Sequence, residues 1–419
     1  SPNHPIHPAR SPDDTRPHPH RTTYPPLVIN PSSTPGIRSA AFRLMLTTTA
    51  LSFSSYSLLL PVVPLWAERG GSGALGSGAT TAVLMATTVG TQLAVPWLLA
   101  RVGHRWVLAA GALLLGLPSP FFAPSPDLAP VLVLSGIRGI GFGLVTVAGS
   151  ALIAELVPRE QHGRATGYYG LAVGLPQIAL YGGGVAMADA FGFPAVFLVA
   201  GLAPVLGALA VPGIRGARRR VPSRTRSPRP PVRSSAAPLV AMLTCAVAQG
   251  GIITFLPLAV PGGGLVVPAA LLATAAGAML GRLAGGELVD RLGWGGRLLV
   301  PGMLLAAAGL AAEVLGGDVL VVAGAAVVGF GFGIVQNDSL TTLFTAFGAA
   351  GYGVASALWN IAFDAGTGVG ALGIGAVADG FGYPAGFASA AALLGVGVVV
   401  ALLVPARRTR AGRVPGSRS

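Results

Sequence analysis

Apolar residues dominate this chain in stretches of about twenty, which short polar connections separate. A helix of that length crosses the roughly 30 Å hydrocarbon core of a bilayer at about 1.5 Å per residue. The pattern therefore predicts an all-α integral membrane protein with twelve transmembrane helices. We place these at residues 41–66, 78–99, 106–125, 129–156, 164–188, 194–212, 238–260, 266–289, 298–315, 319–345, 352–377 and 384–405.

The second half of the chain repeats the first at an offset of 190 residues, as from Leu99 to Val289. Because that offset contains six spans, both copies insert with the same topology, which predicts two pseudo-symmetric six-helix bundles at 39–212 and 238–405. Three pairs of segments share the offset: LARVGHR with VDRLGWG, GIGFG (Gly139 to Gly143) with GFGFG (Gly329 to Gly333), and DAFGFPA (from Asp189) with DGFGYPA (from Asp379).

The basic residues are all arginine, and the net charge is +13. In a soluble protein this charge would suggest nucleic acid, but here it lies in loops and tails, so we expect no nucleic-acid partner. The arginines fall on alternate connections, which by the positive-inside rule places both termini in the cytoplasm. We expect a multi-pass protein of a bacterial cytoplasmic membrane, with a disordered tail at 1–38, a basic linker at 213–237 and a basic tail at 406–419.

The sequence shows no sign of catalytic or cofactor chemistry. The single Cys245 excludes an intrachain disulfide and a cysteine-based metal site. Paired catalytic groups, metal-ligand clusters and a P-loop pattern are absent from the sequence. We therefore predict neither an enzyme nor a cofactor nor a metal site.

One loop carries a specific resemblance. The segment GGELVDRLGWGGR resembles the motif G-x-x-x-D-R-x-G of the major facilitator superfamily, in the form found in bacterial efflux permeases; the matching residues are Gly286, Asp290, Arg291 and Gly293. The resemblance implies that Asp290 braces a cytoplasmic gate by meeting the start of the fifth helix near Gly163, where Arg164 adds a cation. The alternative is a solvated loop carboxylate.

The first-half copy of this motif is degraded. It keeps Arg101, Gly103 and Arg105, but Pro96 stands in place of the glycine and Ala100 in place of the aspartate. Because alanine cannot form the brace, we expect an asymmetric gate.

The fifth predicted helix resembles the glycine and proline motif of drug and metabolite exporters, through Gly170, Gly174, Pro176 and Gly182. Small residues allow close helix contact and a proline can form a hinge. The motif departs from the family by reading Gly-Leu-Pro, and close packing alone is the alternative interpretation. In the fourth helix Arg138 directly precedes Gly139, whereas the family's arginine lies four positions before the first glycine, so its role is not carried over.

Ionisable residues at membrane depth are costly and mark functional candidates. Asp364 is our first choice for proton coupling, with Asn360 one turn away on the same face; an ion pair with an arginine of the other half is the alternative. For Asp338 we expect a pair with Arg282 or a gate contact, and Arg282 could instead extend to the surface. Arg138 needs an anionic substrate or Asp364 as its partner.

By resemblance, the first, fourth, seventh and tenth helices line the cavity, which adds Gln249, Gln336 and Asn337 as candidates. These observations predict a monomeric secondary transporter that works by alternating access. Proton-coupled export of a small organic molecule is the favoured function. The alternative is an uptake symporter or facilitator for an anionic or sugar-like metabolite.

Overall fold

The computed structural model describes residues 36–214, 232–260, 262, 264–348 and 351–404. The predicted tails, apart from 36–38, and the linker residues 215–231 lie outside the described residues. Within them the chain forms twelve α-helices and no strand. The helices are α1 (Ala40–Arg69), α2 (Gly73–Val102), α3 (His104–Gly116), α4 (Leu128–Leu156), α5 (His162–Phe191), α6 (Phe193–Ala210), α7 (Val232–Ala259), α8 (Val266–Leu292), α9 (Leu299–Leu315), α10 (Asp318–Phe347), α11 (Tyr352–Phe381) and α12 (Tyr383–Leu403).

The helices have the lengths and apolar character that a bilayer requires. Ten helical segments are long and apolar enough to cross a membrane. The other two helices are α9, which has 17 residues, and α2, which has 30. The predicted all-helical membrane fold is confirmed, and the count of twelve spans stays a prediction.

Two helix boundaries differ from the predicted ones for local reasons. The α3 helix ends at Gly116 rather than near residue 125, because Pro118 and Pro120 have no N–H to continue its hydrogen bonds. A short 3₁₀ turn, η2 (Ser119–Phe122), follows. The α7 helix begins at Val232, within the segment that we assigned to the linker.

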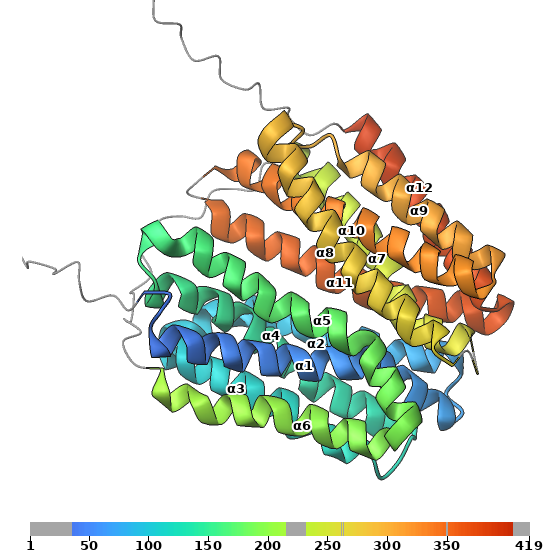
Figure 1. Cartoon of the computed structure of the whole chain (residues 1–419), viewed down its shortest axis with the longest axis horizontal. Helices are drawn as coiled ribbons and strands as arrows, with labels where there is room; N and C mark the ends of the chain where they lie inside the picture. The colour runs from blue at the N-terminus through green and yellow to red at the C-terminus, as the bar shows by residue number, and fades with distance from the viewer. Residues whose placement is uncertain (1–35, 215–231, 261, 263, 349–350, 405–419) are drawn as a thin grey trace, which may run out of the picture. The chain divides into compact units, whose positions relative to one another are not determined.

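Figure 1 shows α1 to α6 in blue to green as one group of neighbouring helices and α7 to α12 in yellow to red as another. Between the groups, α2 packs against α11 and α5 packs against α8. Within each group one helix lies between two others: α4 packs against α2 and α3, and α10 packs against α8 and α9. The repeated glycine segments lie on these two central helices.

The GFGFG segment shows why α10 can lie so close to both neighbours. A methyl group on Gly329 would lie 2.8 Å from the carbonyl carbon of Thr274 in α8, and one on Gly333 would lie 2.8 Å from that of Ala278. Gly331 points the other way, where its methyl group would lie 2.8 Å from the amide nitrogen of Ala306 in α9. Two glycines one turn apart therefore pack against α8, and the glycine between them packs against α9.

The GIGFG segment repeats this arrangement in the first half. Methyl groups on Gly139 and Gly143 would collide with the α2 backbone, lying 2.9 Å from the carbonyl carbon of Leu84 and 2.8 Å from the carbonyl oxygen of Thr88. Gly141 faces α3 instead. The repeat seen in the sequence thus encodes the same two-sided backbone packing in both halves.

The DAFGFPA and DGFGYPA segments form equivalent turns. Gly192 and Gly382 have φ angles of +80° and +84°, which side-chain-bearing L-residues rarely adopt. Each ends one helix and precedes the next, whose first turn contains a proline. The turn makes α5 and α6, and likewise α11 and α12, antiparallel neighbours.

The helix ends define two sides of the molecule. We call one the arginine-rich end, marked by Arg101, Arg105, Arg164, Arg291 and Arg297, and the other the arginine-poor end, marked by Asp127, Asp189, Asp318 and Asp379.

The two halves meet at the arginine-poor end. There the hydroxyls of Thr81 and Thr254 hydrogen-bond at 3.3 Å, and a methyl group on Gly78 would lie 2.9 Å from the carbonyl carbon of Ala371. Toward the arginine-rich end, Gly170 of α5 and Gly353 of α11 have no such neighbour within 4 Å. The close contacts described between the halves thus lie toward the arginine-poor end.

We predict that Gly333→Ala destabilises the fold, because its methyl group must displace the α8 backbone; overpacking of this kind costs about 1–3 kcal/mol. The apparent melting temperature of the purified protein in detergent measures the effect. Gly373→Ala in α11 is the matched control, since a methyl group there meets no atom within 4 Å. Equal melting temperatures for both variants would contradict the packing argument.

Candidate functional site

A hydrogen bond between the two halves lies at membrane depth. The Oδ2 atom of Asp364 in α11 accepts it from Nε2 of Gln92 in α2 at 2.7 Å, and Asp364 is 3% exposed. The Gln92 amide also donates to the hydroxyl of Thr146 in α4, at 3.4 Å. Its Oε1 atom is buried and has no hydrogen-bond partner among the described residues. One carboxyl group thus joins α11 to α2, with α4 as the next neighbour.

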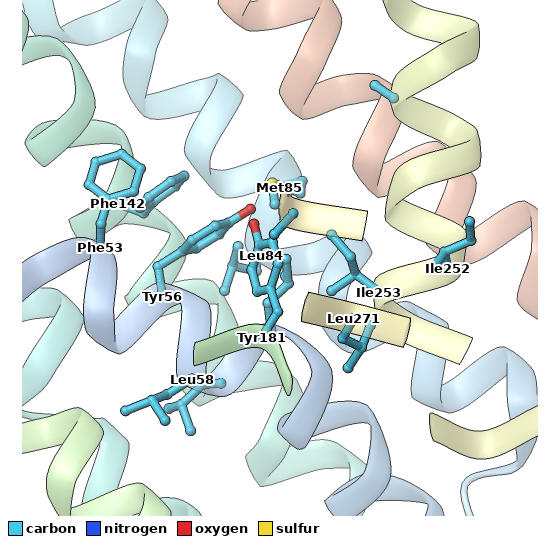
Figure 2. Packing of buried hydrophobic residues seen from close by; sticks show 14 of the residues in the cluster. Phe53, Tyr56, Leu58, Leu84, Met85, Phe142, Tyr181, Ile252, Ile253 and Leu271 are labelled. Carbon is cyan, nitrogen blue, oxygen red and sulfur yellow. The ribbon is translucent and has the colours of Figure 1, made fainter. Parts of the chain in front are cut away.

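Two tyrosines extend this polar region. Tyr56 in α1 and Tyr181 in α5 hydrogen-bond through their side chains, and Figure 2 shows the two tyrosines next to each other. The Tyr56 ring stacks on Phe142, with ring centroids 4.1 Å apart. Tyr56 also lies near Asp364 and Arg138. The tyrosine pair thus belongs to the same buried polar region.

Arg138 does not pair with Asp364, which corrects one of its two predicted partners. Its Nε donates to the carbonyl oxygen of Leu115 at 3.3 Å, and its Nη2 donates to the carbonyl and hydroxyl oxygens of Ser55 at 3.4 and 3.5 Å. Its guanidinium carbon lies 5.8 Å from the centroid of the Phe122 ring. Because Leu115 is in the last turn of α3, the guanidinium stabilises the helix end that the prolines create.

Asp338 does not pair with Arg282 either. Its two carboxyl oxygens accept hydrogen bonds from the backbone N–H groups of Gly296 at 2.6 Å and Leu298 at 2.9 Å. These groups precede α9, so the carboxylate lies at the positive end of that helix dipole. Asp338 ties α10 to the loop that follows the gate motif; of the two roles expected for it, the pair with Arg282 is absent among the described residues, and the gate contact stays a prediction.

Arg282 in α8 contacts α10 through an amide instead of an acid. Its Nε donates to Oε1 of Gln336 at 3.0 Å, and its Nη2 donates to the same oxygen. The neighbouring Asn337 has an Nδ2 group with no hydrogen-bond partner among the described residues, and so does Oε1 of Gln249 in α7. Asn360 binds its own helix, donating to the carbonyl oxygen of Ser356 at 2.8 Å, so nothing links it to Asp364.

The gate motif is open in this structure. Asp290 is exposed and forms no hydrogen bond or ion pair within the described part of the chain. Its predicted neighbours at the start of α5 are equally free: Arg164 is exposed, and Gly163 would meet nothing within 4 Å. The brace therefore stays a prediction for a conformation in which the arginine-rich end is closed.

The remaining motif residues have local roles. Gly103 and Gly293 are the C-caps of α2 and α8, and Gly286 lies beside Asn337. The motif arginines contact nearby groups: Arg291 pairs with Glu287, Arg101 stacks on Trp97 at 4.3 Å, and Arg105 donates to the carbonyl oxygen of Ile214 at 3.5 Å.

Some glycines of the helix-five motif pack against α8. A methyl group on Gly174 would meet the side chain of Met279, and one on Gly182 would meet the backbone of Pro268. Gly170 has open space, and Pro176 lies within the helix. The motif thus supplies close contacts toward the arginine-poor end and none toward the other end.

Sequence reasoning missed Gln92, Tyr181 and the ion pair between His104 and Glu155, whose Nδ1 and Oε1 atoms lie 2.5 Å apart. Gln92 offered a signal, since an amide within an apolar span needs a partner. Its partner lies 272 residues away, so spacing alone could not identify it.

An all-helical membrane fold of two similar halves, with polar side chains buried where they meet, defines a membrane transporter. The family model of the Major Facilitator Superfamily matches residues 45–366. The chain belongs to this superfamily. No curated protein sequence matches it.

Several solved transporters share the fold. A bacterial homologue of the human lysosomal transporter Spinster, inward-facing and occupied, is 14% identical with a TM-score of 0.73, over 87% of this chain and 96% of that one. Its unoccupied inward-facing form is 13% identical with a TM-score of 0.67, over 87% of this chain and 95% of that one. The D323A mutant of the nucleoside transporter NupG is 11% identical with a TM-score of 0.70, over 86% of this chain and 99% of that one. At these identities the likeness shows the fold alone.

We predict that Arg138→Met lowers stability, because it removes the charged donor to the carbonyl oxygens of Leu115 in α3 and Ser55 in α1. Hydrogen bonds to charged groups suggest a loss of about 3 kcal/mol in the free energy of unfolding. Thermal melting in detergent checks this, with Arg43→Met on the exposed face of α1 as the control. A variant that melts like the wild type but no longer transports would instead assign Arg138 to substrate handling.

Proposed function

We propose that the protein exports a small organic molecule in exchange for protons, by alternating access, and that Asp364 carries the proton. The observation that carries this proposal is the hydrogen bond from Gln92 to Asp364, which spans the two halves at membrane depth. A group that binds a proton there can change the contact between the moving parts of the transporter.

The surroundings of Asp364 suit a group that changes its charge. Within the described residues no arginine or histidine lies within ion-pair distance of it. An ionised carboxylate buried without a cation is costly, and a bound proton removes that cost. Gln92 can serve both forms: its Nε2 donates to the carboxylate, and its unpartnered Oε1 is available to accept from the protonated acid.

The tyrosine pair supports coupling between this group and the rest of the first half. Tyr56 of α1 lies near Asp364 of the second half and hydrogen-bonds to Tyr181 of α5. We propose that a change of charge at Asp364 acts through this pair on α1 and α5 as well as on α2. In our proposal this is how proton binding alters the relative stability of the two conformations.

The proposed orientation places the arginine-rich end in the cytoplasm. The close contacts between the halves lie toward the opposite end, which supports access to the site from the cytoplasm, as export requires. The glycines and proline of α5 add support, because they resemble the exporter motif. The second candidate is uptake of an anionic metabolite; Arg282, a deep cation without an acidic partner among the described residues, favours an anionic substrate in either direction.

Asp364→Asn tests the proton site without a known substrate. Infrared difference spectra of the protein in nanodiscs, recorded between about pH 5 and pH 9, report the carboxyl groups that titrate. We expect a carboxyl band that disappears in Asp364→Asn and remains in Asp318→Asn, a control at the exposed start of α10. An unchanged spectrum in Asp364→Asn would refute the assignment.

Transport in proteoliposomes tests coupling and direction. One pH unit is worth about 1.4 kcal/mol, so each coupled proton can drive about a tenfold accumulation per pH unit. With a panel of radiolabelled carboxylates, amides and amines, the wild type should accumulate solute at the expense of the gradient, and Asp364→Asn should only equilibrate it. Accumulation toward the side that corresponds to the cytoplasm would favour uptake.

A further inference from the structure

Arg282 lies on the inward side of α8, next to α10, where its guanidinium bonds to Gln336. The glycines Gly277 and Gly281 press against the α10 backbone. Leu280 and Leu283 are 59% and 60% exposed, which marks the outer face. At about 100° per residue, Arg282 lies roughly 160° from Leu280 and 100° from Leu283 around the helix. Its side chain therefore points inward, and the prediction that it extends to the membrane surface is not supported.

Arg282 lies on α8 just past a contact with α5, on the side of the arginine-rich end. Met279, one turn nearer the arginine-poor end, still touches Gly174 of α5. The next turn of α5 toward the arginine-rich end contains Gly170, which has open space beside it. Arg282 is thus the first residue of this α8 face beyond the contact with α5.

Arg282 has more donors than acceptors around it. A guanidinium carries five N–H groups, and Oε1 of Gln336 is the acceptor that the described residues provide. No acid of the described residues pairs with it. The Nδ2 group of Asn337 on the adjoining α10 also lacks an acceptor. A buried cation with spare donors beside a spare amide donor favours an anion.

We propose that Arg282, held in place by Gln336, binds the carboxylate of an organic anion that enters from the arginine-rich end. The inference rests on the proposed transport function and names its substrate class. Arg138, the other deep arginine, is not the anchor, because its donors are engaged by Leu115 and Ser55. A guanidinium matches a carboxylate with two parallel hydrogen bonds, which lysine cannot form.

Matched ligands test the anchor. Monocarboxylates of increasing chain length and their primary amides have nearly the same shape and differ in charge, and binding to the protein in nanodiscs can be measured for each pair. We expect the wild type to prefer at least one carboxylate over its amide by about tenfold to a hundredfold. Arg282→Gln should abolish the preference, Arg282→Lys should retain part of it, and Arg43→Gln on exposed α1 should leave it unchanged.

The proposal is overturned if no carboxylate binds the wild type better than its amide, or if the preference survives in Arg282→Gln. The infrared test of Asp364 is independent of this result. A titrating Asp364 without carboxylate preference would refute the anchor and leave proton coupling in place, whereas the reverse result would refute only the coupling.

A second contact, at the arginine-poor end, carries an independent inference. The Oδ1 atom of Asp379 in α11 accepts a hydrogen bond from the backbone N–H of Ala74 at 3.1 Å. Ala74 lies in the first turn of α2, and Ser72 provides no side-chain cap for that helix. A methyl group on Gly73 would lie 2.8 Å from the same carboxyl oxygen. A carboxylate of the second half thus caps a helix of the first.

The equivalent position in the first half forms no such contact. Asp189 occupies the same place in the repeat and is exposed like Asp379, but no hydrogen bond joins it to α8 within the described residues. We infer that Asp379 is a one-sided latch that must release α2 before the arginine-poor end can open.

Spin labels test the latch in a Cys245→Ser background, with cysteines at the exposed positions 127 and 318 of the arginine-poor end. Asp379→Ala should shift the label-to-label distances in nanodiscs toward longer values, because the substitution removes a hydrogen bond that stabilises the closed state. Asp189→Ala is the matched control and should reproduce the parent distribution. A parent-like distribution in Asp379→Ala, or an equal shift in both variants, would exclude the latch.

Discussion

Close backbone packing around the two central helices is the constraint on which the other features depend. Helices in a bilayer gain little from hiding apolar surface, so small residues that allow backbone contact determine their positions. Gly333 presses on the α8 backbone beside Arg282, and Gln336 follows one turn later on α10. Gly143 presses on α2 at Thr88, and Thr146 and Gln92 meet one turn further on. The glycine contacts thus place the polar groups of both halves within hydrogen-bond distance.

Burying a charge in the membrane interior costs free energy, and three kinds of hydrogen-bond partner offset this cost for the deep charged residues. Arg138 is surrounded by carbonyl oxygens, so its charge is used to hold a broken helix end. Asp338 is surrounded by backbone N–H groups, and its charge fixes a loop. Asp364 and Arg282 each have a single amide side chain as their hydrogen-bond partner. Full compensation is typical of a structural role, whereas incomplete compensation leaves a group able to bind a proton or a ligand.

The sequence predicted the class of fold because its main determinants are local. Apolar length sets the spans, glycines set the turns and contacts, and the repeat recurs at a fixed offset. The candidate site was harder to predict: Asp364 and Arg282 were found as isolated polar residues, but their partners were not. Gln92 and Asp364 are brought together only by packing of α2 on α11, and Asp338 and Arg138 bind backbone atoms, which carry no sequence signal.

The order of the contacts between the halves adds a reason to connect Asp364 with opening. Three hydrogen bonds join the halves in the described residues, and on the α2 side they involve Ala74, Thr81 and Gln92 in turn. The first two lie toward the arginine-poor end, where the interface is tight. Gln92 is the last and lies nearest the arginine-rich end. In the proposed mechanism, protonation of Asp364 changes this outermost bond and leaves the two bonds nearer the arginine-poor end in place.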